Sequence, residues 1–279
     1  GWNTGENSIL MKKLFNIKIL KTIGALADDN NVQVYVVGGY VRDRLFGITS
    51  KDLDFVVVGD GPAFAEKVAD HLESKNFKVY KNFGTAMIKH RGKILEFVGA
   101  RSENYRGDSR KPEVKQADLH ADLTRRDFTI NAMAVGLNKE NYGQLVDPFN
   151  GHDDLQNGII RTPREPEQTF YDDPLRTMRA IRFACRFQYT IEEKTKAGLA
   201  STANRLEIIS QERITEELSK ILASEKPSHG FFLMDETGVL DVILPEITAL
   251  KGVDQVGPHR HKDVFFHTLK VVDNVAMVS

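Results

Sequence analysis

Two aspartates two residues apart give the strongest chemical signal in the sequence. Asp52 and Asp54 lead into an apolar run that continues to Val58, which is typical of a β-strand. Side chains alternate along a strand, so both carboxylates are expected on one face of a sheet. A divalent cation would relieve their mutual repulsion, and oxygen ligands of this kind suit Mg²⁺, which retains water ligands and accepts phosphate oxygens. The simpler alternative is a strand edge without a metal, because Asp-x-Asp is a common pattern.

A glycine pair precedes these aspartates by a short connection. The apolar run 35–37 ends in Gly38-Gly39, and a short helical pattern that contains Arg42 follows. Glycine allows a tight turn, and the backbone N–H groups at a helix N-terminus can bind a phosphate. Gly39, Arg42 and the two aspartates together predict a site for a nucleotide and a metal ion.

Two more groups of charged residues extend this prediction. A two-metal site usually needs a third carboxylate, and Glu96 in the alternating segment KILEFVGAR is the best candidate, with an exposed strand acid as the alternative. Arg125, Arg126 and Asp127 precede a pattern that predicts an apolar helix up to Leu137. Basic residues at a helix N-terminus oppose its dipole and so favour an anionic partner. The alternative is that Asp127 only caps the helix.

A second helix carries an unusual arginine pattern. Four charged residues recur at every third position: Asp173, Arg176, Arg179 and Arg182. With Arg186 the helix has four arginines in eleven residues and no acid among them, which indicates phosphates or carboxylates as partners. A solvated basic face is the alternative, and Asp173 could cap the helix because Pro174 follows it.

Composition and periodicity limit the class of protein. The 279 residues are 41% hydrophobic, enough for about two domains, and the net charge of −1 means that nucleic-acid binding would depend on local Lys and Arg clusters. A single cysteine excludes an intrachain disulfide and predicts a cytoplasmic protein, and no run is long enough to cross a membrane. Apolar spacing predicts helices over 14–27 and 63–75, strands over 78–80, 86–90 and 94–98, and nearly continuous helix from Pro174 to about 223.

Five segments in a fixed order resemble one known family. They are GGYVRDRLFG with KDLDFVV (38–57), RRDFTINAMA (125–134), DPFNGHDDLQNGIIR (147–161), DDPLRTMRAIRFACRF (172–187) and SQERITEELSKIL (210–222). The sequence is similar in these segments to the class II tRNA nucleotidyltransferases and bacterial poly(A) polymerases, whose head has a DNA-polymerase-β-like fold. The resemblance spans roughly residues 30 to 225.

The resemblance implies an α+β fold with four parts. We expect an N-terminal extension and helix over 1–29, a nucleotidyltransferase head with a mixed sheet over 30–160, a helical neck over 161–224, and the start of a helical body over 225–279. Residues 261–274 resemble the opening helix of a His-Asp-type phosphohydrolase domain, so we expect the chain to be a fragment.

The resemblance also implies a reaction. We expect Mg²⁺-dependent, template-independent addition of CCA to the 3′ end of tRNA from CTP and ATP, with release of pyrophosphate. The alternatives are a poly(A) polymerase that uses ATP, and a CC- or A-only tRNA nucleotidyltransferase. Poly(A) polymerases typically carry a basic segment after the Asp-x-Asp strand, whereas residues 56–68 here are mostly acidic or neutral, which favours CCA addition. The expected partners are RNA and nucleotides, with no DNA and no membrane.

Individual roles follow from the same resemblance. Asp52, Asp54 and Glu96 would hold Mg²⁺, Arg126 would bind the triphosphate and Asp127 the ribose. Asp173 and Arg176 would read the base edge, since a carboxylate accepts from an exocyclic amine and a guanidinium donates to ring acceptors. The other expected nucleotide-binding residues are Gly39, Arg42, Arg179 and Arg182. The charged stretch 100–124 would be a flexible loop that helps add the final adenosine.

Overall fold

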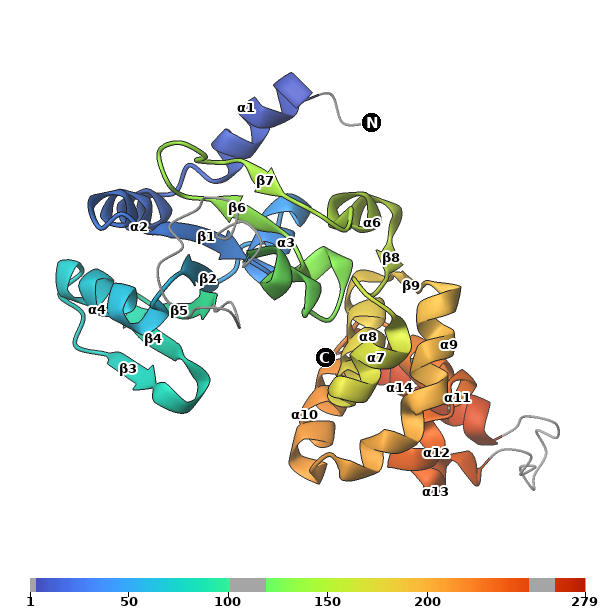
Figure 1. The fold of residues 1–279 in the computed structure, drawn as a ribbon. Helices are drawn as coiled ribbons and strands as arrows, with labels where there is room; N and C mark the ends of the chain where they lie inside the picture. Colours follow the sequence, from blue (N-terminus) through green and yellow to red (C-terminus); the bar gives the residue numbers. More distant parts are fainter. Residues whose placement is uncertain (1–3, 101–118, 251–263, 279) are drawn as a thin grey trace. The chain divides into compact units, whose positions relative to one another are not determined.

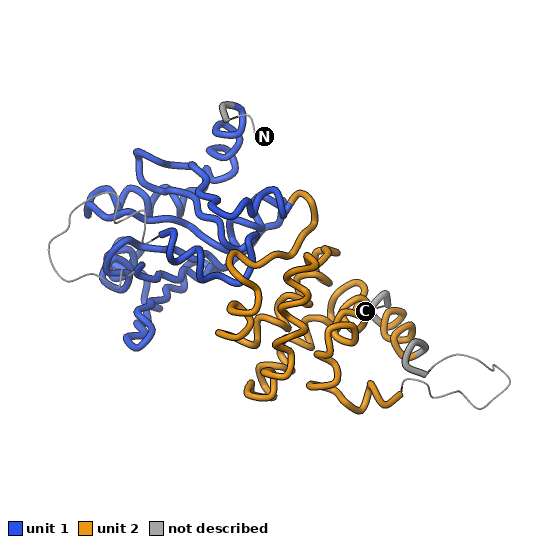
Figure 2. The backbone as a smooth tube through the Cα atoms, turned by 45° about the vertical axis from the view of Figure 1, so that its right-hand side comes forward, with its two compact units in different colours: residues 1–155 blue, residues 156–279 orange. Residues whose placement is uncertain are grey.

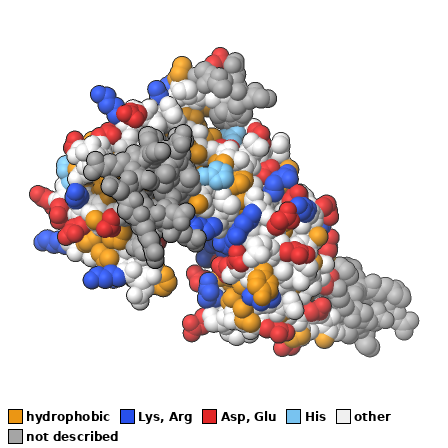
Figure 3. Space-filling model, in the orientation of Figure 1, with side chains coloured by type: hydrophobic (Ala, Val, Ile, Leu, Met, Phe, Trp, Pro, Cys, Tyr) orange, Lys and Arg blue, Asp and Glu red, His pale blue; other side chains and the backbone are white. Residues whose placement is uncertain are grey.

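The chain divides into two compact units, residues 1–155 and residues 156–279 (Figure 2). The structure is a computed structural model that describes residues 4–100, 119–250 and 264–278. Basic and acidic side chains both occur over the face shown in Figure 3.

The first unit is built on a mixed sheet (Figure 1). Its strands are β1 (Gln33–Val37), β2 (Asp52–Val58), β3 (Phe77–Tyr80), β4 (Thr85–His90), β5 (Lys93–Ala100), β6 (Ala134–Gly136) and β7 (Leu145–Val146). Its helices are α1 (Thr4–Leu14), α2 (Lys18–Asp29), α3 (Gly39–Phe46), α4 (Gly61–His71) and α6 (Gly151–Asn157), the last crossing into the second unit. The described strands lie in the order β3-β4-β5-β2-β1-β6-β7, with β2 and β5 parallel and the other pairs antiparallel. The expected α+β fold with a mixed sheet is confirmed.

The two faces of this sheet bury different side chains. On one face, α2 and α4 pack on the odd-numbered residues of β2, with Phe55 stacked on Phe97 of β5 at 4.8 Å between ring centroids. On the other face, Val56 and Val58 belong to a smaller apolar cluster with Tyr35 and Val37. Asp52 and Asp54 lie on this second face because they alternate with the buried residues of the first.

The predicted helix over 14–27 is interrupted in the structure. α1 ends at Leu14 and α2 begins at Lys18, because Phe15 is fully buried against Tyr40 and Ile17 is extended. The predicted apolar stripe still holds within α2, where Ile19 and Ile23 are buried.

The prediction of an apolar helix after Asp127 is wrong. A short 3₁₀ turn (Thr129–Asn131) is followed by strand β6. Side-chain hydrogen bonds compete with a helix here: the Thr129 hydroxyl donates to Asp154, and the Asn131 amide donates to Asp127. Without that helix, the dipole argument for an anion beside Arg125 and Arg126 no longer applies.

The second unit is almost entirely helical. Its helices are α7 (Pro166–Asp172), α8 (Leu175–Phe187), α9 (Glu193–Thr202), α10 (Gln211–Leu222), α11 (Pro227–Glu236), α12 (Val239–Ile243), α13 (Pro245–Thr248) and α14 (Val264–Val278), with a 3₁₀ helix over Ala203–Ile208. Strands β8 (Ile159–Ile160) and β9 (Thr190–Ile191) form a small parallel pair. α8 is strongly amphipathic, and its apolar side packs against α7, α10 and α11. Among the described residues, no helix is both long and apolar enough to cross a membrane.

Candidate active site

The three predicted metal-binding carboxylates lie on two neighbouring parallel strands. Asp54 of β2 stands directly opposite Glu96 of β5, and Asp52 lies two residues before Asp54. Residues in register project to the same face of a sheet, so all three carboxylates share the second face of the first unit. Both exposed members, Asp52 and Glu96, flank the half-buried Asp54.

The charges of these groups act on one another and on Arg126. Burial raises the pKa of Asp54, the negative charge of Asp52 raises it further, and the positive charge of Arg126 lowers it. Burial also raises the pKa of Glu96. The negative charges of Asp54 and Asp52 raise this pKa further, and the positive charge of Arg126 lowers it. Three carboxylates and one guanidinium therefore form a single charged cluster in which the negative charge is in excess.

This cluster fits an ion that takes few protein ligands. In the part of the chain that the structure describes, no three His, Cys, Asp or Glu side chains are gathered closely enough to enclose one metal ion. A fully coordinating cage, as for structural zinc, is therefore absent from the described residues. Mg²⁺ is usually bound through one or two carboxylates, with water and phosphate oxygens completing its coordination. The pairing of Asp54 with Glu96 satisfies that smaller requirement.

Arg126 connects the carboxylates to the glycine turn. Its Nη1 lies 2.9 Å from the point where a β-carbon on Gly38 would stand, so a side chain at position 38 would displace it. Gly38 also has a φ of +70°, which favours glycine. Nε and Nη2 of Arg126 donate to Asp122 at 3.2 and 3.1 Å. Asp122 thus fixes the guanidinium beside the N-terminus of α3, where Gly39 is the first residue.

Arg42 lies inside the first unit. It is 5% exposed, forms an ion pair with Asp43 at 2.9 Å, and donates to the side-chain oxygen of Asn131 at 2.6 Å. The Asn131 amide in turn donates to Asp127 at 3.0 Å. Arg42 therefore supports Asp127, the residue that the resemblance assigns to the ribose, and a phosphate-binding role for Arg42 remains a prediction.

Replacement of Arg42 by alanine is expected to destabilise the first unit. The change removes one partner of the buried ion pair with Asp43, and breaking such a pair typically lowers the free energy of unfolding by about 3–5 kcal/mol. Denaturant unfolding measures this loss, with Lys51→Ala as a control because Lys51 is exposed. Unchanged stability combined with weaker nucleotide binding would instead assign Arg42 to the ligand.

Asp173 and Arg176 lie at the start of α8 in the second unit. The half-buried Asp173 accepts a hydrogen bond from the Leu175 backbone at 3.2 Å, so the expected competition from capping is present. A carboxylate has about four lone-pair positions, and this bond uses one of them. Arg176 donates from Nη1 to the Thr169 carbonyl of α7 at 3.2 Å, which orients its guanidinium.

The remaining arginines of α8 are held by neighbours within the second unit. Arg182 forms an ion pair with Glu217 of α10, with Nε and Oε2 2.6 Å apart. This contact is an ion pair and not a hydrogen bond, because the geometry at those two atoms does not satisfy one. The guanidiniums of Arg179 and Arg182 lie 5.4 and 4.6 Å from the Phe183 ring. Glu217 supplies the acid that the arginine pattern lacks in its own helix, so Arg182 needs no external anion; its assignment to a nucleotide remains a prediction.

Several residues of the site were not predicted from the sequence. Asp122 was detectable, since it lies four residues before Arg126, a spacing that pairs opposite charges on a helix. Asn131 and Asp43 had no comparable signal, because their roles depend on tertiary contacts. The predicted adenosine-addition loop falls mostly on residues 101–118 and lies outside the described residues.

Two family models match the chain. A model described as the poly A polymerase head domain matches residues 34–161, which include all the candidate residues of the first unit. A second, described as the probable RNA and SrmB-binding site of polymerase A, matches residues 188–251.

Similar proteins and structures agree with these matches. The A-adding tRNA nucleotidyltransferase of Halalkalibacterium halodurans is 39% identical over 235 residues, covering 82% of this chain and 54% of the relative. A CCA-adding enzyme solved with CTP has a TM-score of 0.77 at 36% identity, covering 90% of this chain and 57% of that one. A tRNA nucleotidyltransferase solved with a primer tRNA and an ATP analogue has a TM-score of 0.69 at 33% identity, covering 82% and 67%. The chain spans little more than half the length of the A-adding relative.

Proposed function

The chain belongs to the family of class II tRNA nucleotidyltransferases and bacterial poly(A) polymerases, and on this basis we propose that it adds nucleotides to the 3′ end of tRNA. The proposed reaction is template-independent addition of CCA from CTP and ATP. The 3′ hydroxyl of the RNA loses its proton to solvent as its oxygen bonds to the α-phosphorus of the nucleotide, the bond between that phosphorus and the oxygen that bridges to the β-phosphate breaks, and pyrophosphate leaves. We assign the head to residues 30–160 and the neck to residues 161–224.

The pairing of Asp54 with Glu96 beside Arg126 is the observation that carries this proposal. Nucleotidyl transfer needs negative oxygens to bind cations and a positive group to bind the triphosphate, and the first unit brings both together on one face. Gly38 leaves room for the Arg126 guanidinium beside the N-terminus of α3, where backbone N–H groups can bind a phosphate. The two halves of the required chemistry are therefore adjacent.

Mg²⁺ is the proposed cofactor, and two ions would share the carboxylates of Asp52, Asp54 and Glu96, so that neither ion needs all three. When bound, it would stabilise the attacking and leaving oxygens and neutralise phosphate charge. Arg126 holds the triphosphate, Asp127 contacts the ribose, and Asp173 and Arg176 recognise the base edge. Adenine and cytosine both present an amine and a ring acceptor to such a pair, unlike guanine and uracil.

A-only addition is the second candidate. The A-adding enzyme of Halalkalibacterium halodurans is 39% identical to this chain over 235 residues. An enzyme of this kind would use ATP on a tRNA that already ends in CC. A poly(A) polymerase would use ATP without regard to that end.

Product analysis with defined tRNA ends separates these activities. The protein is incubated with Mg²⁺ and tRNAs that lack CCA or end in C or CC, together with CTP, ATP or both, and the products are sequenced. If the protein adds CCA, incubation with CTP and ATP together should extend each of these tRNAs to a complete CCA end. Extension of the CC end alone by a single A would identify an A-adding enzyme, and a long A tract would identify a poly(A) polymerase. No incorporation on any substrate would refute the proposal.

A further inference from the structure

The carboxylate face of the sheet continues past Glu96 to the edge strand β3. Glu96 of β5 pairs with Met87 of β4, and Met87 pairs with Lys78 of β3. Paired residues project to the same face, so Asp54, Glu96, Met87 and Lys78 form one row across four neighbouring strands. The surface beyond Glu96 is therefore in direct continuity with the candidate active site.

The adjacent rows add an aromatic ring and a second lysine. One row next to that of Glu96 contains Tyr80, which pairs with Thr85, and Thr85 pairs with Val98. Another row, beyond Glu96 in the opposite direction along the strands but on the same face, contains Lys89, which pairs with Ile94. We define the strand platform as Lys78, Tyr80, Met87 and Lys89. Tyr80 is 43% exposed, and both lysines are exposed.

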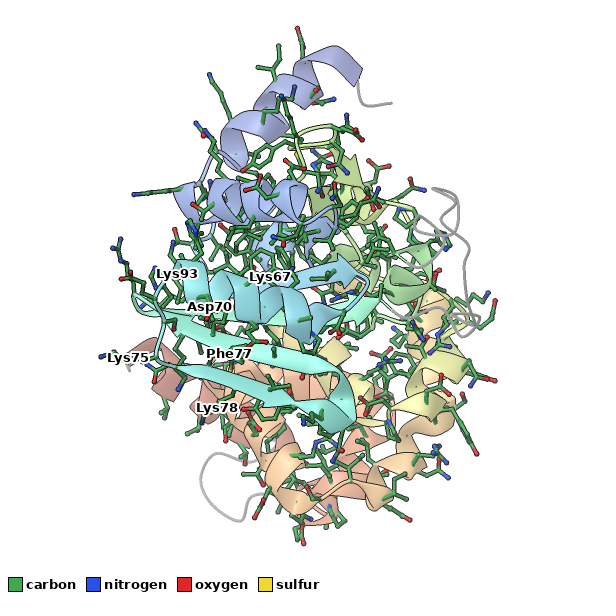
Figure 4. All side chains as sticks on the ribbon, turned by 60° about the vertical axis from the view of Figure 1, so that its left-hand side comes forward. Lys67, Asp70, Lys75, Phe77, Lys78 and Lys93 are labelled. Carbon is green, nitrogen blue, oxygen red and sulfur yellow. The ribbon has the colours of Figure 1, made fainter. Side chains whose placement is uncertain are left out.

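The opposite face of the same strands is a closed core. There α4 packs on β3, β4 and β5, and it buries Ala86, Ile88, Leu95 and Phe97 completely. Figure 4 shows α4 across these strands, with Lys67 and Asp70 on the helix and Lys78 on β3. The strand platform is thus the side of β3 and β4 on which charged and aromatic groups remain accessible.

The charges of the strand platform suit a polyanion. Neither Lys78 nor Lys89 has an ion-pair partner among the described residues. The acidic residues of these rows, Asp52, Asp54 and Glu96, lie on β2 and β5 at the inner end, and the platform strands β3 and β4 contribute none of them. A positive surface with an exposed ring is the combination that binds single-stranded nucleic acid, through phosphate contacts and base stacking.

The order of the strands places the two expected substrates on opposite sides of the carboxylates. Gly38 follows β1, which pairs with β2 on the side away from β5, and Arg126 lies beside Gly38. The triphosphate therefore approaches from the β1 side, and the strand platform occupies the β5 side. Three strand spacings of about 4.8 Å separate Asp54 from Lys78, roughly 14 Å. This is the length of about four stacked nucleotides at 3.4 Å each.

We propose that the strand platform binds the single-stranded 3′ segment of the acceptor RNA, with Lys78 and Lys89 contacting phosphates and Tyr80 stacking on a base. The proposal rests on the proposed function, because it assigns the second substrate of that reaction. It is tested separately by direct binding of a short single-stranded RNA that ends in CC, without nucleotide, at several salt concentrations.

The double variant Lys78→Ala/Lys89→Ala is expected to bind this RNA about tenfold more weakly. The slope of the logarithm of affinity against the logarithm of salt concentration should become shallower by about 0.7 for each phosphate that the variant no longer neutralises. Tyr80→Ala should weaken binding by a similar factor while Tyr80→Phe preserves it, since the ring alone is needed for stacking. Lys67→Ala/Lys93→Ala is the matched control, because it removes the same charge from the α4 side of the strands (Figure 4).

In transfer assays the Lys78→Ala/Lys89→Ala variant should raise KM for RNA and leave KM for the nucleotide unchanged. Wild-type affinity and salt slope in this variant would overturn the proposal, as would an equal weakening in the control variant or equally tight binding of polyglutamate. If the wild-type protein binds the RNA as described but incorporates no nucleotide, the proposed function fails and the strand platform stands.

Discussion

Replacement of Asp54 by alanine is expected to lower the rate of nucleotide transfer by at least about a thousandfold. Asp54 faces Glu96 across two parallel strands and lies beside Asp52, so it is the central carboxylate of the cluster. Its removal leaves too few oxygens to hold the cations that stabilise the attacking and leaving groups. Single-turnover transfer to a defined tRNA at saturating Mg²⁺ measures the effect, and Asp52→Ala should behave in the same way.

The fold should survive this change and even gain stability. Because the pKa of Asp54 is raised in the folded protein, the folded state retains its proton at pH values where the unfolded chain has released it. The carboxylate therefore costs the fold stability as the pH rises from the ordinary carboxylate pKa, and this cost is complete once the pH exceeds the raised pKa. The free energies of unfolding of Asp54→Ala and wild type should be closest at acid pH and diverge in favour of the variant as the pH rises past the ordinary carboxylate range.

Glu66→Ala serves as the control, since Glu66 is an exposed acid on α4 and lies on the other side of the sheet. It should retain both activity and stability. A near-normal transfer rate in Asp54→Ala would refute the two-metal mechanism for this protein. A large decrease in stability would mean that Asp54 is a structural residue whose environment compensates its charge.

The sequence was sufficient to predict that the carboxylates share one face of a sheet, but it did not predict which strands pair with each other. The period of two places Asp52 and Asp54 on one side of a strand, and the same reasoning applied to Glu96. That β5 pairs in parallel with β2 depends on a crossover through α4, β3 and β4, for which the sequence carries no local signal. The register that puts Glu96 opposite Asp54 is consequently a tertiary result.

Helix α8 shows why arginines that recur regularly in the sequence need not share one role. An α-helix has 3.6 residues per turn, so each step of three residues rotates the side chain by about 60°. Arg182 therefore points about 120° away from Arg176, a change large enough for the two to meet different neighbours. Arg182 contacts Glu217 of α10, whereas Arg176 donates to Thr169 of α7. Glu217 lies 35 residues after Arg182 in the sequence, so this ion pair could not be predicted from the sequence of the helix alone.

Replacement of Arg126 and replacement of Arg176, both of which are expected to contact the nucleotide, should change the kinetics in different ways. Arg126 lies beside the glycine turn, so Arg126→Ala should raise KM for every nucleotide alike, because the triphosphate is common to all of them. Arg176→Ala should instead narrow the preference for CTP and ATP over UTP and GTP. A polar group that pairs with the correct base edge rejects a base that leaves it unsatisfied, at about 1–3 kcal/mol or roughly ten- to hundredfold in rate.

A lysine at position 176 separates base recognition from simple charge. Lysine keeps the positive charge but lacks the planar fork that donates two parallel hydrogen bonds, so Arg176→Lys should lose specificity almost as fully as Arg176→Ala. Steady-state kinetics with all four nucleotides on one tRNA measure this, and Arg186→Ala is the control from the exposed end of the same helix. Suppose that Arg176→Lys kept full specificity, or that Arg176→Ala depressed all four nucleotides equally. Arg176 would then bind a phosphate, Asp173 would serve mainly through its hydrogen bond to Leu175, and base recognition would have to come from other residues.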